Sequence, residues 1–191
     1  MSGGFSRIGE REVHQGHIWR VVVAEFESPD GDRFERDIVR SPGAVGIVAL
    51  LFDAEGRASV VLMRQYRPAH DGVVVEIPAG MRDVEGEPTE LTARRELAEE
   101  VGLAATRLDL LVELFPSPGL TDSVTTVYLA TGCSNVERQL HGPEETHSEV
   151  VHVPLDEAVA MVERGELHDA KTVAGILLTA RRIAAGDTRG G

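Results

Sequence analysis

The sequence of 191 residues contains one cysteine, Cys133, and one tryptophan, Trp19. A single cysteine excludes a disulfide framework within the chain, which is consistent with a reducing compartment. No apolar run approaches the length of a membrane span, and the first residues lack the apolar core of a signal peptide. These absences predict a cytoplasmic protein that has no membrane partner.

Positive charge is also scarce. The chain has 19 Lys and Arg against 32 Asp and Glu, which gives a formal net charge of −13. Such a charge repels polyanions and argues against binding to nucleic acids or acidic membranes. An anionic substrate would need local help from metal ions and a few arginines. The length suits a compact enzyme with a sizeable core, and the sequence shows neither a repeat nor a long linker.

Hydrophobic patterns broken by turn signals predict a mixture of strands and helices. Residues 17–26 and 33–40 read as strands joined by the turn Ser28-Pro-Asp-Gly31, which predicts an N-terminal β-hairpin. Further strands are expected at 44–52, 58–66, 73–77, 108–115, 123–130 and 150–153, and helices at about 88–101, 156–164 and 171–185. This order predicts an α+β protein with helices around a mixed sheet. We expect residues 1–40 to form the hairpin region and residues 41–191 the main domain.

Three carboxylates crowd one side of the helix that is expected to have Pro88 in its first turn and to end at Gly102: Glu96, Glu99 and Glu100. Like charges at this spacing destabilise a helix unless a cation lies between them. Oxygen ligands of this kind suit Mg²⁺ or Mn²⁺ better than zinc. The segment therefore predicts a metal site, the alternative being a solvated acidic helix face, as most glutamate runs are.

The rest of the segment supports this interpretation. An apolar stripe on the helix is expected from Leu91, Leu97, Ala98 and Val101. Upstream, residues 73–80 read as a strand broken by Pro78 and Gly80. A strand, a glycine-containing loop and a glutamate-rich helix together would hold backbone carbonyls and carboxylates around one ion.

Residues 80–103 resemble the Nudix box, G-x5-E-x7-R-E-U-x-E-E-x-G-U with U apolar, of the Nudix hydrolase superfamily. The matching residues are Gly80, Glu87, Arg95, Glu96, Leu97, Glu99, Glu100, Gly102 and Leu103. One departure exists, because six residues rather than five separate Gly80 from Glu87. The resemblance implies the Nudix fold, a mixed β-sheet sandwiched between helices, with a small antiparallel sheet at the N-terminus.

From about residue 16 to residue 180, the chain is similar to the ADP-ribose pyrophosphatase subfamily. Gln65-Tyr66-Arg67 ends a strand, Glu76-Ile-Pro-Ala-Gly80 follows it, and Pro118 lies fifteen residues after Leu103, where the subfamily carries a marker proline. An ordinary loop is the alternative explanation for the proline. The signatures of the NADH and coenzyme A pyrophosphatases are not visible. The resemblance implies Mg²⁺-dependent hydrolysis of ADP-ribose to AMP and ribose 5-phosphate by a homodimer.

The resemblance also implies roles for individual residues. The metal would be held by Glu96, Glu99, Glu100 and the carbonyl of Ala79, with Glu100 also expected to act in catalysis. Arg95 would pair with an acidic neighbour such as Glu87 and orient the helix.

A catalytic base is expected in the polar loop 141–149. Glu145 matches the position of the base in related pyrophosphatases, and its neighbour Glu144 is the alternative. His147 stands where the subfamily carries an acidic residue, so the resemblance implies no clear metal ligand there. A solvated loop without a catalytic role is the competing interpretation.

Substrate contacts are expected from Arg40, Arg67, Glu76, Met81 and Trp19. Arg67 would hold a phosphate, although a surface ion pair is the alternative. Glu76 would accept a hydrogen bond from the substrate or orient Arg67. Trp19 lies near the position where relatives stack an aromatic ring on adenine, whereas a lone tryptophan is more often part of a core.

Two other functions stay open. The substrate could be another nucleoside diphosphate derivative or nucleotide, such as a nucleotide sugar, an oxidised nucleotide or a dinucleoside polyphosphate. The chain could also be a regulator that binds ADP-ribose without cleaving it. The complete set of Glu96, Glu99 and Glu100 argues against the regulator, because pure binding does not require metals that activate water.

Overall fold

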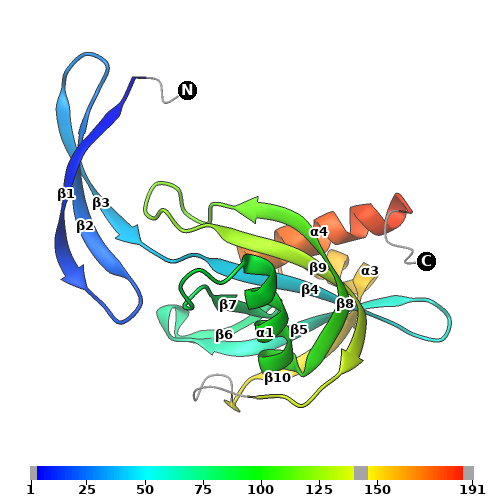
Figure 1. The fold of residues 1–191 in the computed structure, drawn as a ribbon. Helices are drawn as coiled ribbons and strands as arrows, with labels where there is room; N and C mark the ends of the chain where they lie inside the picture. Colours follow the sequence, from blue (N-terminus) through cyan, green and yellow to red (C-terminus); the bar gives the residue numbers. More distant parts are fainter. Residues whose placement is uncertain (1–3, 140–145, 187–191) are drawn as a thin grey trace. The chain divides into compact units, whose positions relative to one another are not determined.

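The computed structural model describes residues 4–139 and 146–186 (Figure 1). Contacts between residues divide the chain into two compact units. One unit comprises Met1–Gly43 and Phe115–Val124, and the other comprises Ala44–Leu114 and Thr125–Gly191. The N-terminal unit therefore includes a segment from the middle of the chain in addition to the region expected at 1–40.

The N-terminal unit is built on a three-stranded antiparallel sheet in the order β1-β2-β3. Its strands are β1 (Ser6–Gln15), β2 (Arg20–Glu27) and β3 (Arg33–Arg40). The predicted hairpin is present as β2 and β3. Strand β2 starts three residues later than the predicted range, because Gly16 donates its N–H to the Trp19 carbonyl in a turn (2.8 Å).

Strand β1 is not predicted from the sequence. Every residue of this strand is exposed, and the pairing with β2 shifts register twice. A strand without a buried side lacks the alternation of apolar and polar residues that marks strands in a sequence. The N-terminal sheet therefore has one strand more than the expected hairpin.

The segment Phe115–Val124 packs on the end of β3 within the same unit. Val39 donates its N–H to the Leu120 carbonyl (2.9 Å), and the Thr121 hydroxyl donates to the Val39 carbonyl (2.7 Å). These bonds fasten the loop that carries Pro118 to the N-terminal sheet.

The larger unit contains a seven-stranded mixed sheet in the order β10-β5-β4-β9-β8, with β6 beside β5 and β7 beside β4. Its strands are β4 (Ala44–Phe52), β5 (Ala58–Arg67), β6 (Gly72–Glu76), β7 (Ala79–Met81), β8 (Leu103–Leu114), β9 (Thr125–Asn135) and β10 (Glu149–Pro154). Strands β4 and β9 are parallel, whereas the other strand pairs of this sheet are antiparallel. Its helical segments are η1 (Pro68–His70), α1 (Thr89–Val101), α3 (Leu155–Glu163) and α4 (Ala170–Ala184).

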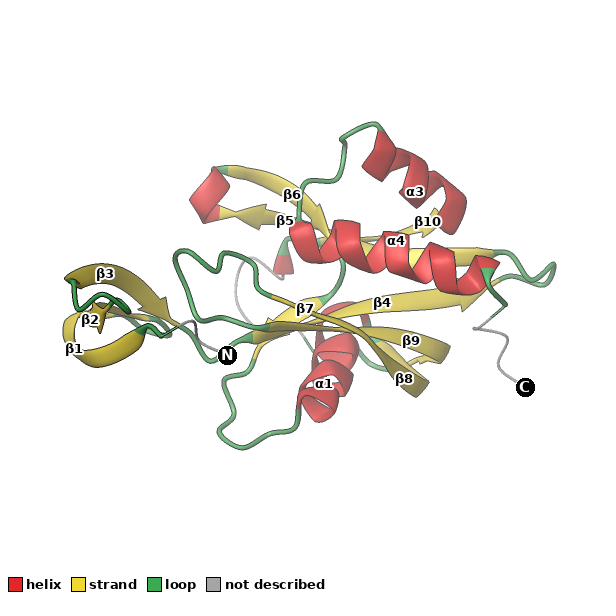
Figure 2. Cartoon of the chain, turned by 90° about the horizontal axis from the view of Figure 1, so that it is seen from above, coloured by secondary structure: helices red, strands yellow, loops and turns green. Residues whose placement is uncertain are grey.

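Helices cover both faces of this sheet (Figure 2). Successive residues of a strand point to opposite faces, and β4 uses both. Ile47 of β4 belongs to a buried cluster with Leu97 of α1, whereas Leu50 belongs to a second cluster with Ile176 of α4. The predicted α+β sandwich of helices around a mixed sheet is therefore confirmed.

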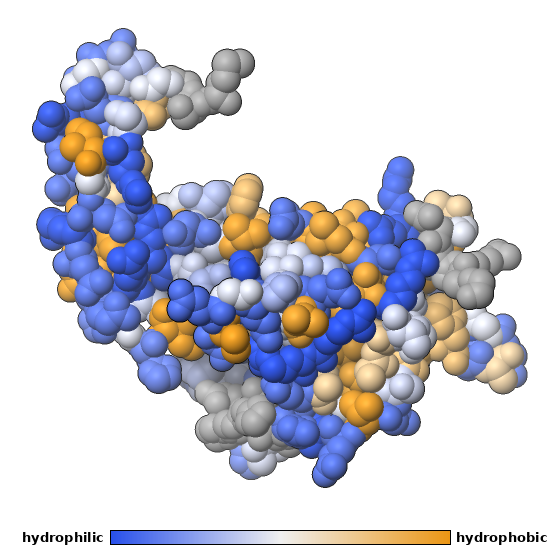
Figure 3. All heavy atoms as spheres, in the orientation of Figure 1, coloured by the Kyte–Doolittle hydropathy of each residue, from blue (hydrophilic) through white to orange (hydrophobic). Residues whose placement is uncertain are grey.

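Hydrophilic residues dominate the face drawn in Figure 3, and hydrophobic groups lie between them. This surface agrees with the 27% of charged residues in the sequence. In the part of the chain that the structure describes, no helix combines the length and the apolar character needed to cross a bilayer.

Candidate functional site

Helix α1 turns carboxylates, not only apolar side chains, toward the protein interior. Its buried residues are Thr92, Ala93, Glu96, Leu97 and Glu100. The prediction that Leu91 belongs to the buried apolar stripe is wrong, because 53% of its surface is exposed. Glu96 and Glu100 are 9% and 5% exposed, so a solvated acidic face does not describe them. Two charged residues on the buried face of a helix make this face a candidate functional site.

The ends of α1 follow the sequence closely. Pro88 was expected in the first helical turn and is the N-cap instead, so the helix begins one residue later, at Thr89. Gly102 ends the helix in the left-handed conformation (φ 67°). Leu97 and Leu103, the apolar positions of the box, are both buried in the core. The box therefore contains packing residues and polar residues, and of the polar residues Glu96 and Glu100 contact strand β7.

At Gly80, strand β7 lies against the end of the Glu96 side chain of α1, in the space that a side chain at position 80 would occupy. A Cβ atom on Gly80 would lie 1.9 Å from the carboxylate carbon of Glu96. Next to it, Ala79 donates its N–H to Glu100 Oε2 (2.7 Å). The contact between Ala79 and Glu100 thus runs through the amide N–H of Ala79, whereas the expected role of its carbonyl toward a metal stays a prediction. Met81, the last residue of β7, is half-buried and pairs with Ala44.

Arg95 occupies the centre of this acidic group. Its guanidinium lies 2.8 Å from Glu96, 3.1 Å from Glu99, 3.4 Å from Glu87 and 3.2 Å from Asp83. The expected pair with Glu87 is present, and Arg95 is the cation that separates the crowded glutamates. In the described ranges, no group of three acidic, histidine or cysteine side chains is arranged to hold a metal ion.

The electrostatics of Glu96 are unusual for a carboxyl group. Burial raises its pKa to about 7, Arg95 opposes this rise, and the charge of Glu99 adds to it. An ionised Glu96 is therefore unfavourable in this environment without further positive charge. The hydrogen bond from the Ala79 N–H fixes the orientation of the Glu100 carboxylate.

A second polar cluster lies at the end of β6. Arg67 binds the Glu76 carboxylate through two hydrogen bonds of 2.6 and 3.0 Å, and Lys171 Nζ lies 2.5 Å from Glu76 Oε2. Burial alone would raise the pKa of Glu76, but the bonds and charges of Arg67 and Lys171 outweigh it and lower the pKa to about 2. Glu76 therefore orients Arg67, one of the two roles expected for it.

Three residues of this cluster are not predicted from the sequence: Asp169, Lys171 and Thr172. Asp169 caps α4 by accepting hydrogen bonds from the Thr172 N–H and hydroxyl. The signal available in the sequence was an Asp directly before an apolar helical segment, which is a typical N-cap. Nothing in the sequence alone indicates that this helix start meets Glu76.

Two further arginines of the larger unit, Arg138 and Arg82, lie close in space or in sequence to α1 and β7. Arg138 donates to the Glu100 carbonyl at the end of α1 and to the Ser148 hydroxyl (2.8 Å). Arg82 follows β7, and its Nε atom is buried without a hydrogen-bond partner among the described residues. The expected base Glu145 and its alternative Glu144 lie outside the described residues, whereas His147 is described and exposed.

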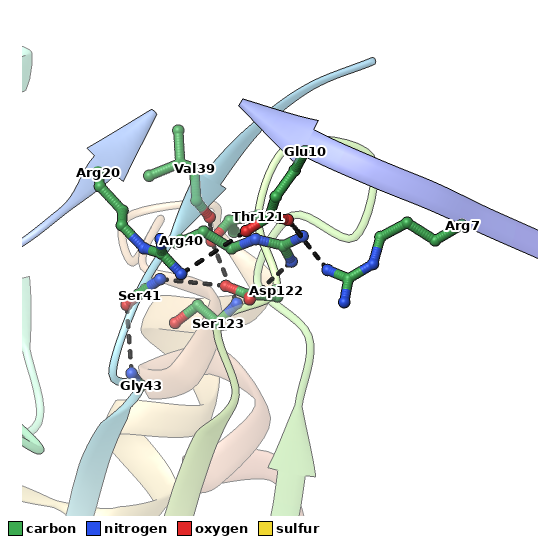
Figure 4. A network of polar contacts seen from close by, with 10 residues as sticks. All are labelled: Arg7, Glu10, Arg20, Val39, Arg40, Ser41, Gly43, Thr121, Asp122 and Ser123. Carbon is green, nitrogen blue, oxygen red and sulfur yellow. Dashed lines mark hydrogen bonds and ion pairs between the residues drawn. The ribbon is translucent and has the colours of Figure 1, made fainter. Parts of the chain in front are cut away.

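Arg40 and Trp19, two expected substrate contacts, belong to the N-terminal unit. Arg40 is held between Glu10, to which it donates a hydrogen bond, and Asp122, which lies 2.9 Å away (Figure 4). Asp122 also accepts the N–H of Ser41 (3.0 Å). Trp19 lies in the turn before β2 and is 51% exposed, so it is not a core residue.

The N-terminal unit also contains a cavity of about 480 Å³. Phe26 and Phe34 are stacked beside it with ring centres 5.5 Å apart, and the Arg36 guanidinium lies 4.7 Å from the centre of the Phe34 ring. Arg40 and Pro118 also line the cavity, whereas Trp19 does not. The described aromatic side chains of this cavity are therefore phenylalanines.

Comparison with known proteins agrees with this arrangement. Residues 42–176 match the model of the NUDIX domain. An ADP-ribose pyrophosphatase of Mycobacterium tuberculosis is 38% identical over 91% of this chain and 82% of its own length. An ADP-ribose pyrophosphatase of Bacillus subtilis is 36% identical over 88% of this chain and 89% of its own length.

A solved structure, described as an ADP compounds hydrolase, has the same fold. The two structures superpose with a TM-score of 0.79 over 97% of each chain, at 24% sequence identity. The family match covers most of the chain, including the acidic helix α1 and the strand β7 that faces it. The chain therefore belongs to the Nudix family.

Proposed function

We propose that this protein is a Mg²⁺-dependent hydrolase that cleaves the pyrophosphate bond of ADP-ribose and releases AMP and ribose 5-phosphate. The observation that carries the proposal is the pair of buried carboxylates on α1, Glu96 and Glu100, held against the β7 loop. The names of the relatives at 36–38% identity support ADP-ribose as the substrate.

The residues around α1 fit a hard divalent cation. Their ligand atoms are oxygens, and Gly80 leaves open the space that a side chain would take from Glu96. Burial makes the negative charge of Glu96 unfavourable, and a divalent cation would compensate it. Glu96, Glu99, Glu100 and the Ala79 carbonyl would hold the ion. When bound, Mg²⁺ or Mn²⁺ would neutralise phosphate charge and make water a stronger nucleophile.

The chain's own side chains would supply the remaining chemistry. Arg67, oriented by Glu76, still has donor atoms free of that bond and would bind a phosphate of the substrate. Glu145 would take a proton from the water that attacks one phosphorus in line. Breaking the bond between that phosphorus and the bridging oxygen then gives the two monophosphates.

A substrate panel tests the proposal. The purified protein is stripped of divalent ions, supplied with Mg²⁺, and assayed with ADP-ribose, a nucleotide sugar, an oxidised nucleoside triphosphate and a dinucleoside polyphosphate. We expect the highest kcat/KM with ADP-ribose. A preference for one of the other compounds would contradict the substrate, and binding of ADP-ribose without cleavage would identify a regulator.

We also propose a cytoplasmic homodimer in which the N-terminal unit, including residues 1–40, takes part in dimerisation. Its support is the resemblance to ADP-ribose pyrophosphatases, a subfamily in which the N-terminal hairpin often crosses to a second subunit. Light scattering on the full chain and on a chain that lacks residues 1–40 measures the contribution of this unit. A monomeric full chain would exclude the dimer.

A further inference from the structure

We propose that Lys171 is a positioning residue for the metal site, although it lies on α4 rather than in the Nudix box. With its neighbours it fastens the end of β6 to the start of α4, and β6 leads through Ile77 and Pro78 into strand β7, whose Gly80 lies beside Glu96. The inference rests on the proposed function, because it concerns the same metal site.

Lys171 belongs to a closed ring of polar contacts. Its Nζ lies 2.5 Å from Glu76 and 3.0 Å from Asp169. The Thr172 hydroxyl donates to Asp169 (2.5 Å) and accepts the N–H of Ile77 (2.9 Å). Because Glu76 and Ile77 are consecutive, these contacts join both residues to the first turn of α4.

The ring depends on the ammonium group at its centre. The side chains of Glu76, Lys171 and Asp169 are 6%, 14% and 20% exposed. Without the ammonium group, Glu76 would keep its bonds to Arg67, but no cation would separate its charge from that of Asp169 in this little-exposed region, which is costly. Lys171 is also the single lysine among the 19 basic residues of the sequence.

The ring is connected to the metal site by a short stretch of backbone, residues 77–80, which hydrogen bonds at Pro78 and Ala79 hold in place. After Ile77, the Pro78 carbonyl accepts the N–H of Ile47 (2.8 Å), and Ala79 donates to Glu100 (2.7 Å). Gly80 then lies against the Glu96 carboxylate without room for a side chain. A shift of Ile77 would therefore move this stretch relative to both buried glutamates.

The experiment replaces Lys171 by a neutral side chain of similar length and measures metal binding directly. Mn²⁺ affinity of substrate-free wild type, K171M, K171R and T172V is measured by electron paramagnetic resonance. We expect K171M and T172V to bind Mn²⁺ about tenfold more weakly, the lower end of the loss that follows when groups that orient metal ligands are removed. K171R keeps the positive charge and should restore most of the affinity.

A matched control removes an ion pair that does not reach the site. Arg164 pairs with Glu157 and Glu166 on the surface of the larger unit (2.7 and 2.6 Å). R164M should bind Mn²⁺ like the wild type and keep its kcat. Unfolding midpoints of all variants are measured, so that a general loss of stability is recognised.

Steady-state kinetics with ADP-ribose and Mg²⁺ give a second readout. We expect K171M to lower kcat about tenfold while R164M does not. Wild-type Mn²⁺ affinity and kcat in a folded K171M would overturn the positioning role and leave the proposed function intact. A wild type that cleaves no ADP-ribose would overturn the proposed function, and Mn²⁺ affinity would still decide the role of Lys171. If K171M does not fold, T172V decides by the same two measurements.

The single lysine allows a spectroscopic test in which Lys171 itself is not replaced. Lysine labelled with ¹³C at Cε gives one side-chain signal, since the sequence contains one lysine. Mg²⁺ should shift this signal in the wild type and shift it less in T172V, where the ring is open. An unchanged signal at saturating Mg²⁺ would show that the ring and the metal site are independent.

Discussion

Gly80 and Glu96 compete for one volume: a Cβ atom on residue 80 would lie 1.9 Å from the carboxylate carbon of Glu96. Real Cβ atoms do not approach other heavy atoms so closely, so G80A must displace Glu96 or the β7 loop. We expect G80A to lower kcat/KM about 100-fold or more, as the loss of a ligand orientation does. The measurement is hydrolysis of ADP-ribose with saturating Mg²⁺.

The control for G80A is G9A. A Cβ on Gly9, in β1, would meet no atom within 4 Å. G9A should therefore keep wild-type activity. Equal activities of G80A and G9A would show that the close approach to Glu96 has no role in the reaction.

Glu96 and Glu100 can be tested by removing charge without changing shape. We expect E96Q and E100Q to lose turnover almost completely while circular dichroism shows an unchanged fold. E90Q, on the exposed first turn of α1 and paired with Arg94 (2.9 Å), is the matched control and should remain active. Substantial activity of E96Q with Mg²⁺ present would rule out the proposed metal site.

The raised pKa of Glu96 predicts a pH effect on the metal-free protein. Folding raises this pKa from 4.5 to about 7, so the folded state binds more protons than the unfolded state between these values. The contribution of Glu96 to stability is therefore present below pH 4.5 and lost as pH rises through 7. In chelator, E96Q should become more stable than the wild type as pH rises, measured by urea unfolding at pH 5 and pH 8.

The lowered pKa of Glu76 predicts the opposite dependence of stability on pH. Its pKa falls from 4.5 to about 2 on folding, so its stabilising contribution is present above pH 4.5 and lost as pH falls through 2. By this shift E76Q should be less stable at pH 7 by roughly 3 kcal/mol. The difference from the wild type should shrink on acidification, measured by urea unfolding from pH 7 to pH 3. E157Q, which removes an exposed partner of Arg164, should change stability little at any pH.

The catalytic base can be identified by two neighbouring substitutions. E145Q should reduce kcat by roughly 10²–10⁴-fold, the range for the loss of a general base. E144Q is the matched comparison and should keep most of the activity. If E144Q is the inactive variant instead, the base is Glu144, and unchanged kcat in both variants would exclude this pair.

Sequence patterns predicted the elements that bury an apolar face. Strands such as β4 and helices such as α4 have apolar residues at the spacing of their secondary structure, so their positions were found within a few residues. Strand β1 was not predicted, because none of its residues is buried and its sequence therefore has no apolar pattern. Its place in the sheet depends on backbone hydrogen bonds to β2, which any sequence can make.

The candidate site was predictable where its residues are close in sequence. Glu96, Glu99 and Glu100 are within five positions, so helix geometry alone places them together. Lys171 lies 95 residues after Glu76, and their contact depends on how α4 packs on the sheet. Such a contact leaves no local pattern in the sequence, and it can be recognised only in the folded structure.

The enclosure of Lys171 has a consequence for the chemical durability of the protein. Ribose phosphates in their open-chain aldehyde form react with exposed lysine amines and slowly glycate proteins. The one lysine of this chain is mostly covered and already bonded to two acids. An enzyme that releases a reducing sugar at its own surface would, with this composition, offer that product little lysine to attack.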